Sequence, residues 1–395
     1  MTSRLYYQDS YLRSFRAAVV ETADDGRRVY LDQTAFYPSS GGQPFDTGQI
    51  GASRVMDVLD EEEQDRIAHV VETPLVAGSY DCAVDWPRRW DHMQQHTGQH
   101  LLSAVLLDLF NAPTVSFHLG QLSSTIDIET RNLAPEQIDQ AVERANQIVC
   151  ESRSVTVSYH EATQDVRLRK PSERAGTLRV VSIQDLDRSA CGGTHVRSTG
   201  EIGAILIRSI DKVRGHVRVE FLCGGRAIRR ARADYEALSR IARHFSAPSD
   251  QVPALVAQQG ERLAEADKLR RKLAFELAQV RGRELHASTT PNAAGLRVHV
   301  GRLEKGPMSD EVRAEAQAFA GAGNAVYVVA CAEPASVLVA VSQPGPFAAG
   351  ATLKPLLEQH GGRGGGNAQL AQGSLPSREA ADLVVCELTG RPVPA

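Results

Sequence analysis

Two pairs of side chains, far apart in the chain, place the strongest demand on how this protein folds. The stretch HTGQHLLS contains His96 and His100, and the stretch CGGTHV contains Cys191 and His195. On a helix, residues four apart lie on the same face, so His96 and His100 can point at a common atom. The two glycines after Cys191 permit a tight turn that wraps the backbone around an ion. The pattern predicts a fold that brings a helix and a glycine turn together around one metal.

The donor types in these pairs favour zinc. Three imidazoles and a thiolate are borderline-soft ligands that suit a tetrahedral zinc ion. Each motif alone is weak, because paired histidines are common on exposed helices and an isolated Cys-x-x-x-His spacing carries little information. Four protein ligands would close the site, whereas three would leave a place for a water whose pKa could fall to about 7. The sequence supplies four candidates and leaves both arrangements open.

Composition places the chain among ordinary globular proteins. It has 395 residues, enough for two to four domains, with 42% hydrophobic and 23% charged residues. No apolar run reaches the length of a membrane span, and the first residues lack the apolar core of a signal peptide. Six scattered cysteines do not form a disulfide scaffold. We therefore expect a cytoplasmic protein that binds no membrane.

A local basic region flanks the second motif, although the formal net charge is −4. Residues 166–232 contain fifteen Lys or Arg against six Asp or Glu. A solvated cationic surface is the ordinary interpretation of such a run. Beside a metal site, the same charge would suit a polyanionic substrate. The candidate contacts within this region include Arg214 and Arg218.

Hydrophobic patterning predicts an α+β fold in four parts. Residues 1–88 alternate short apolar runs with turns, as a small antiparallel β domain or β-barrel does. Residues 89–225 mix helices, at 91–110 and 134–152, with antiparallel strands and carry the candidate metal ligands. Residues 226–288 read as long helices, and residues 289–395 as a small α/β domain.

The helical part has a spacing typical of a coiled coil. Its apolar positions follow a three-four alternation that suits self-pairing or a helical hairpin, and packing on its own domain is almost as good an interpretation. The seam residues are Val252, Val256, Leu263, Ala266, Leu273, Leu277 and Val280. The pattern makes a homodimer through this segment, or through the C-terminal domain, a candidate assembly.

A glycine-rich loop adds a third element. The stretch TAFYPSSGGQPFDTG contains Thr34, Gly41, Gly42 and Gln43, so a hydroxyl and an amide accompany a flexible turn. Taken alone, this segment would be an ordinary hairpin turn.

Several ordered motifs together resemble a known family. FYPSSGGQPFDTG, HTGQHLL, CGGTHVRSTGEIGAILI and GHVRVEFLCGG occur in the order and spacing of the editing domain of alanyl-tRNA synthetases. The free-standing AlaX-type alanyl-tRNA editing proteins are the closer match. GGRGGGNAQLAQG resembles the signature of the DHH-associated C-terminal domain. The chain is thus similar to the long form of AlaX, without the aminoacylation domain.

The resemblance implies a function and a set of site residues. It implies a zinc-dependent aminoacyl-tRNA hydrolase that deacylates mischarged Ser-tRNA of alanine identity, with Gly-tRNA as a second candidate. His96, His100, Cys191 and His195 would hold one zinc ion. Thr34, Gln43 and Cys191 would form the catalytic site, with Thr34 binding the serine hydroxyl. The remaining substrate-binding candidates are Gly41, Gly42, Arg214, Arg218, Arg363, Gly364, Gly365 and Gly366.

Two other functions remain open at this point. A zinc-stabilised tRNA-binding protein would keep the metal and the basic region but lack hydrolysis. A phosphoesterase is the other alternative, because the C-terminal domain is associated with DHH enzymes, yet the chain has no Asp-His-His run. A zinc peptidase is less favoured, since HTGQH lacks the glutamate of the HExxH pattern.

Overall fold

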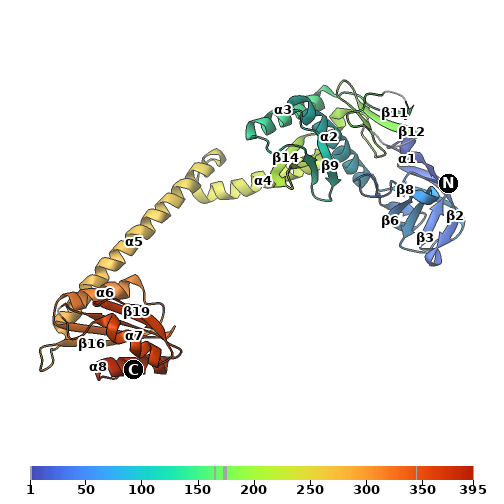
Figure 1. Cartoon of the computed structure of the whole chain (residues 1–395). Coiled ribbons are helices and arrows are strands. Elements are labelled where there is room, and N and C mark those ends of the chain that lie inside the picture. The colour runs from blue at the N-terminus through green and yellow to red at the C-terminus, as the bar shows by residue number, and fades with distance from the viewer. Residues whose placement is uncertain (1, 164–165, 172–175, 344, 395) are drawn as a thin grey trace. The chain divides into compact units, whose positions relative to one another are not determined.

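The computed structural model describes residues 2–163, 166–171, 176–343 and 345–394 (Figure 1). They form two compact units, Met1–Ile241 and Ala242–Ala395. Several sheets alternate with helices, so the predicted α+β class is confirmed. The finer division into four domains stays a prediction. No helix among the described residues is both long and apolar enough to cross a bilayer.

The N-terminal part of the first unit is a closed antiparallel sheet. Its strands pair in the order β2-β3-β7-β6-β5-β8, and β8 pairs again with β2. They are β2 (Ser14–Ala23), β3 (Arg28–Leu31), β5 (Gly48–Ile50), β6 (Ser53–Glu61), β7 (Arg66–Val71) and β8 (Gly78–Val84). Alternate apolar side chains such as Leu31, Ile50 and Ile67 fill the interior. Beside it, β1 (Ser3–Arg4) pairs with β4 (Gln33–Thr34), and α1 (Leu5–Gln8) lies between them in sequence.

A long helix, α2 (Trp86–Phe110), leads into the rest of the unit. It begins before the predicted start at residue 91, because Pro87 can occupy the first turn of a helix. It ends at Asn111, which adopts a left-handed conformation with φ 49°. Its residues Leu101, Leu102 and Leu106 are fully buried in the core.

Two sheets and a helix pack around α2. One sheet has the order β14-β15-β10-β9 and the other β11-β12-β13. The elements are β9 (Thr114–Leu119), β10 (Ser124–Ile128), α3 (Pro135–Glu151), β11 (Val155–Glu161), β12 (Thr177–Ile183), β13 (Asp187–Ala190), β14 (Ile205–Val213) and β15 (His216–Cys223). The predicted helix at 134–152 and the predicted antiparallel strands are both present, and β13 is short and polar.

Two helices follow the sheets: α4 (Gly224–Phe245) and α5 (Val252–Ser288). The helix prediction for this segment is confirmed. Most of the predicted seam is exposed: Val256, Leu263, Leu273, Leu277 and Val280 show between 40% and 69% of their surface. The coiled coil and the homodimer stay predictions.

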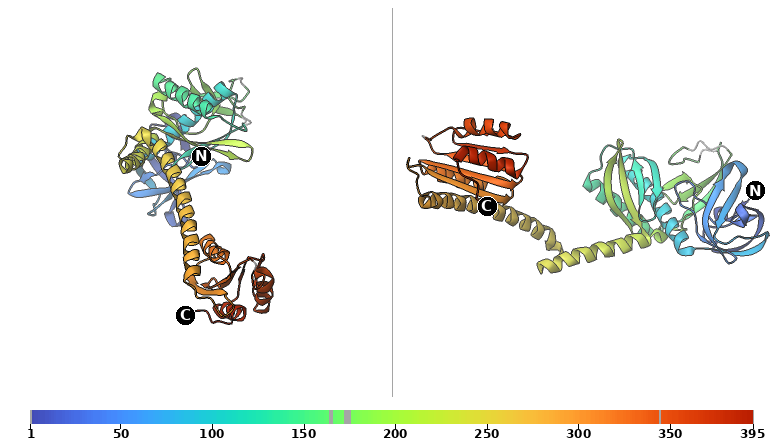
Figure 2. Two further views of the ribbon diagram at one scale, coloured as in Figure 1. Left: turned by 90° about the vertical axis from the view of Figure 1, so that its left-hand side faces the viewer. Right: turned by 90° about the horizontal axis from the view of Figure 1, so that it is seen from below.

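The second unit has a five-stranded sheet covered by helices on both faces (Figure 2). The end of α5 and α6 (Asp310–Gly321) cover one face. On the other face lie α7 (Ala349–Gln359) and α8 (Arg378–Thr389). The strands, in sheet order, are β16 (Arg297–Lys305), β17 (Ala325–Glu333), β18 (Ser336–Val341), β20 (Leu370–Ser374) and β19 (Arg363–Gly366).

Candidate metal centre and substrate cavity

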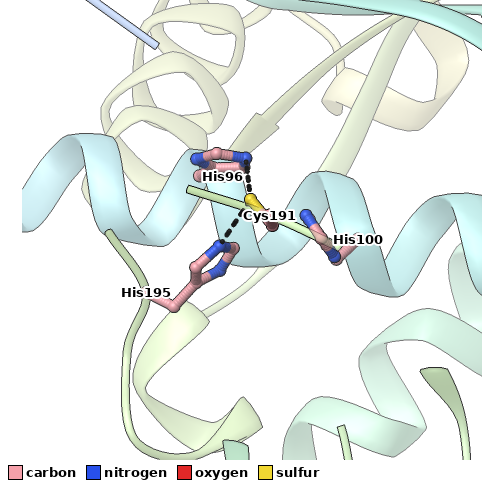
Figure 3. A group of neighbouring side chains, drawn as sticks. All are labelled: His96, His100, Cys191 and His195. Carbon is pink, nitrogen blue, oxygen red and sulfur yellow. Dashed lines mark hydrogen bonds between the residues drawn. The ribbon is translucent and has the colours of Figure 1, made fainter. Parts of the chain in front are cut away.

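The two sequence motifs meet inside the first unit. His96 and His100 lie one turn apart on α2, and Cys191 and His195 lie on the loop that follows β13 (Figure 3). One ligand atom from each of the four residues lies within 4.8 Å of all the others. The three imidazoles are nearly fully buried. A convergence of four such donors is a candidate metal centre.

The spacing of these donors fits zinc. The Sγ atom of Cys191 lies 3.4 Å from Nε2 of His96 and 3.3 Å from Nε2 of His195. Ligand bonds of tetrahedral zinc place a sulfur and a nitrogen about 3.6 Å apart. The separations are therefore compatible with a shared cation.

Gln43 fixes the orientation of the first imidazole. Its Oε1 accepts a hydrogen bond from Nδ1 of His96 at 2.9 Å, which leaves Nε2 free to face the sulfur. The amide is itself held, since Nε2 of Gln43 donates to the Thr194 hydroxyl and Oε1 accepts from the Thr194 N–H. Gln43 thus acts on the metal ligand, and it is not among the described residues that line the cavity described below.

The other two imidazoles are oriented in the same way. Nδ1 of His100 lies 3.1 Å from a carboxylate oxygen of Asp187, and Nδ1 of His195 lies 3.1 Å from the Thr97 hydroxyl. Such partners fix the ring nitrogen that faces a metal and raise its basicity. The sequence analysis missed both Asp187 and Thr97. Thr97 lies inside the HTGQH motif and offered a signal, whereas Asp187 belongs to the unpredicted strand β13.

Electrostatics favour the thiolate form of Cys191. Burial raises the pKa of this thiol, but the neighbouring His96 and His195 outweigh it, so the pKa lies well below its ordinary value. Burial, together with the nearby carboxylates of Asp81 and Asp32, raises the pKa of Cys82 to about 12, and that cysteine stays a thiol. Because a thiolate is the form that binds metals, Cys191 is suited to be a ligand.

The glycine-rich loop makes a tight turn beside the centre. Ser40 and Gln43 exchange backbone hydrogen bonds, and the two residues between them have positive φ angles, 55° at Gly41 and 83° at Gly42. Two-residue turns of this kind favour glycine at both positions. A Cβ atom at Gly42 would also lie 2.9 Å from the Phe117 ring. The turn therefore places Gln43 in contact with His96, and Gly41 forms part of the wall of the cavity described below.

A cavity of about 860 Å³ opens beside the centre. Cys191 and His100 form part of its wall, together with aromatic and charged side chains. These include Tyr7, Tyr37, Phe117, Arg4, Asp60, Glu62, Glu129, Arg169 and Lys170. Its volume lies within the range of sites for small molecules.

Thr34 occupies a different position from the other candidates. Its hydroxyl lies 2.8 Å from Nε2 of His69 and accepts a hydrogen bond from the N–H of Phe36 at 3.1 Å. The side chain is fully buried and is not among the described residues that line the cavity. Its hydroxyl is thus already engaged by His69 on β7 and by the backbone of Phe36.

Much of the basic region is neutralised locally. Arg218 on β15 pairs with Asp127 at 2.7 Å, whereas Arg214 is exposed in the turn between β14 and β15. Further arginines in salt bridges are Arg169, Arg197, Arg208, Arg226, Arg230 and Arg232. Arg4, Arg169 and Lys170 line the cavity, where Arg4 pairs with Asp60 and Arg169 pairs with Asp187.

The C-terminal candidates lie in the second unit. Residues 363–366 form the edge strand β19, which pairs antiparallel with β20. A Cβ atom at Gly364 would lie 2.4 Å from the Cα atom of Gly373, so close strand packing already requires a glycine there. Arg363 is exposed.

Comparison with known proteins identifies the family. A model of the threonyl and alanyl tRNA synthetase second additional domain matches residues 178–220, which include Cys191 and His195. The chain is 30% identical to the alanyl-tRNA editing protein AlaX-L of Pyrococcus horikoshii, over 96% of both chains. The protein belongs to the family of AlaX-type alanyl-tRNA editing proteins. The predicted resemblance is thereby confirmed.

Other relatives match parts of longer proteins. The chain is 30% identical to the alanine–tRNA ligase of Pyrococcus furiosus over 98% of its own length but only 43% of that protein. It therefore spans less than half the length of this ligase. It is also 34% identical to the alanyl-tRNA editing protein Aarsd1 of Bos taurus, over 56% of this chain and 54% of that one.

Proposed function

We propose that this protein is a trans-editing hydrolase that deacylates mischarged Ser-tRNA of alanine identity, with Gly-tRNA as a second substrate. The observation that carries the proposal is the convergence of His96, His100, Cys191 and His195 beside a cavity of about 860 Å³, whose wall includes His100 and Cys191. Relatives across nearly the whole chain are named as alanyl-tRNA editing proteins.

The chemical need for such an enzyme follows from the limits of a synthetase pocket. A hydrophobic pocket rejects an analogue that only adds a hydroxyl by about a hundredfold. A second site that binds the hydroxyl can separate serine from alanine further. A free-standing hydrolase would supply that second selection after the tRNA has been charged.

The residues of this chain would prepare the site in advance. Gln43, Asp187 and Thr97 hold the three imidazoles so that each Nε2 faces Cys191. Four protein ligands would saturate a tetrahedral ion, which favours a positioning role. When bound, zinc would supply positive charge beside the cavity and neutralise the buried thiolate. Lys170 at the cavity would attract the phosphates of the tRNA 3′ end.

Contacts with the rest of the tRNA would come from more distant residues. Arg214 and Arg218 are candidates on the first unit, and Arg363 with Gly364, Gly365 and Gly366 on the second. Exposed arginines contribute mainly a salt-dependent, sequence-independent attraction to phosphates. Recognition of the alanine-specific features of the tRNA would then require contacts other than those of these arginines.

A deacylation assay tests the proposal. Ser-tRNA and Ala-tRNA of alanine identity are incubated with the intact protein and with Cys191→Ala, and bound zinc is measured in both. We expect rapid loss of serine with the intact protein, and loss of both zinc and activity in the variant. Cys150→Ala, which removes an exposed cysteine on α3, is the control and should behave as the intact protein does. A protein that binds zinc and tRNA without releasing serine would be the tRNA-binding alternative instead.

A further inference from the structure

Cys191 differs from the three imidazoles of the candidate metal centre in how its donor atom is held. Within the described part of the chain, no side chain outside the centre donates a hydrogen bond to its Sγ atom, which instead accepts one from the backbone N–H of Gly193 at 3.4 Å. The other contacts of Sγ are with Nε2 of His96 and Nε2 of His195. The position of the sulfur therefore depends on what fixes the backbone of residues 191–193.

Arg179 on β12 fixes this backbone. Its Nη1 atom donates hydrogen bonds to the carbonyl oxygens of Cys191 at 2.7 Å and of Gly193 at 3.0 Å. In the other direction, the N–H of Cys191 donates to the carbonyl of Arg179 at 3.0 Å. Strand β12 lies between β11 and β13 and pairs with both, so its own backbone is held on two sides. The turn that carries the sulfur is thus attached to a rigid element at both of its ends.

The same turn is linked to the imidazole of His96. Thr194, the residue that follows the turn, donates its N–H to Oε1 of Gln43 at 3.1 Å, and this oxygen also accepts from Nδ1 of His96. A shift of the turn would therefore disturb the thiolate and one imidazole together. Because metal sites depend on outer contacts that lock their ligands in place, a residue that holds this turn acts on the whole centre.

The guanidinium of Arg179 is buried without a counter-ion. The residue is only 9% exposed, and its Nε and Nη2 atoms have no hydrogen-bond partner among the described residues. Buried Arg89, by contrast, pairs with Asp46. A buried unpaired charge is unfavourable, and the ring of Tyr7, 5.4 Å from the guanidinium carbon, compensates it only in part. The neighbouring thiolate of Cys191 would supply the missing negative charge.

We propose that Arg179 is the positioning residue of the thiolate ligand: it holds the turn so that Sγ of Cys191 faces Nε2 of His96 and Nε2 of His195 (Figure 3). The inference rests on the metal centre of the proposed function and adds a residue outside both the ligand set and the cavity wall. Without the guanidinium, the turn would lose both carbonyl contacts, and the backbone N–H that meets the sulfur would no longer be held there.

Replacement of the guanidinium tests the inference through metal binding. Arg179→Met in the full-length protein should lower zinc affinity by about 10-fold to 100-fold, measured against a competing chelator. With Co²⁺ in place of zinc, the sulfur-to-metal charge-transfer band should move to lower energy, because a sulfur that accepts no hydrogen bond gives up charge more readily. Arg179→Lys retains the positive charge and a donor, so it should recover part of the affinity and part of the band shift.

Arg226 provides a matched control in the same unit. It is 7% exposed, and its guanidinium donates to the carboxylate of Asp91 and to the carbonyl of Gly120. Among the described residues it has no hydrogen bond to the four donors or to the turn of Cys191. Arg226→Met should therefore lower the midpoint of denaturant unfolding but leave the zinc affinity and the cobalt spectrum unchanged.

Two outcomes overturn the inference. One is a zinc affinity and a charge-transfer band in Arg179→Met that match those of the intact protein. The other is an equal loss of zinc affinity in Arg226→Met, because affinity would then follow stability alone. If Arg179→Met does not fold, the shorter, neutral Arg179→Gln gives the same comparison. An intact protein that binds zinc but releases no serine would contradict the proposed function and leave the metal result standing.

Discussion

At the scale of single residues, the metal centre depends on which ring nitrogen of each histidine is free. Gln43, Asp187 and Thr97 each occupy an Nδ1 atom and leave the Nε2 atoms to face Cys191. Outer partners of this kind are worth about 10-fold to 100-fold in metal affinity. The ligands alone do not define the site, because their orientation comes from side chains that bind no metal.

Gly193 lets the backbone approach the metal ligand His96. A Cβ atom at this position would lie 2.1 Å from Cε1 and 2.4 Å from Nδ1 of the imidazole. We therefore expect Gly193→Ala to push the ring out of place and to lower zinc affinity by at least about tenfold. Zinc titration with a competing chelator measures the effect. Gly192→Ala is the control, since its Cβ atom would meet Tyr7 at an ordinary 3.4 Å, and equal affinities in both variants would contradict the steric argument.

His69 should make stability depend on pH. Burial lowers its pKa to about 4 from the ordinary 6.5, so below pH 6.5 the unfolded chain binds this proton while the folded chain does not. The neutral ring is fully compatible with the fold above pH 6.5, and stability is lost as the pH falls from 6.5 towards 4. Between pH 7 and pH 5 the loss from this group should be about 2 kcal/mol.

Denaturant unfolding at pH 7 and pH 5 checks this effect. The free energy of unfolding should fall more steeply in the intact protein than in His69→Gln, which has no titrating ring at this position. Other titrating groups contribute the same pH dependence to both proteins. The difference between the two pH-dependent losses of unfolding free energy therefore comes from His69. Identical pH dependence in the two proteins would show that the ring is already protonated or accessible in the fold.

At the scale of elements, a buried ion pair joins the glycine-rich loop to α2. Arg89 and Asp46 are both completely buried, and Nε of Arg89 donates to Asp46 at 2.9 Å. Asp46 also accepts from the N–H of Tyr37, and Arg89 donates to the carbonyl of Ser10. The pair thus ties the loop that carries Gln43 to the helix that carries His96 and His100.

Breaking this pair should destabilise the first unit strongly. Asp46→Asn leaves the buried Arg89 uncompensated, which costs about 3–5 kcal/mol of unfolding free energy. Asp127→Asn is the matched control, because its partner Arg218 is 42% exposed and such a pair contributes about 1 kcal/mol or less. Denaturant unfolding of both variants measures the difference. Similar losses in the two would mean that the Arg89 guanidinium finds other partners.

At the scale of the whole molecule, the chain separates the metal centre from the glycine-rich C-terminal motif. The four donors lie within Met1–Ile241, whereas Arg363 and the glycines that follow it lie within Ala242–Ala395. The two units have their own apolar cores. We therefore expect that metal binding by the first unit and tRNA binding by the second unit can be altered independently.

Removal of residues 290–395 tests this separation. We expect the shortened protein to keep one zinc per chain, because every donor and every orienting side chain remains. Its affinity for tRNA should fall, and the salt dependence of binding should weaken as phosphate contacts are lost. Metal analysis and tRNA binding at several salt concentrations give both results. Loss of zinc on truncation would mean that the second unit supports the centre.

The sequence by itself predicted most of the elements and the four residues that converge as candidate metal ligands. Periodic apolar residues predicted α2, α3 and the strands around them, because burial of one face imposes a repeat that can be read locally. Strand β13 and the final hairpin of β19 and β20 were not predicted, because polar or glycine-rich strands lack that apolar repeat.

Only the tertiary structure decided what surrounds the donors. Asp187 and Thr97 are recognisable as partners of His100 and His195 once the chain has folded, because no spacing rule links them. The same folding engaged the Thr34 hydroxyl with His69 and left the buried Oε1 of Gln99 without a hydrogen-bond partner among the described residues. Local chemistry is encoded residue by residue, whereas the pairing or isolation of a buried polar group depends on which distant segments pack against it.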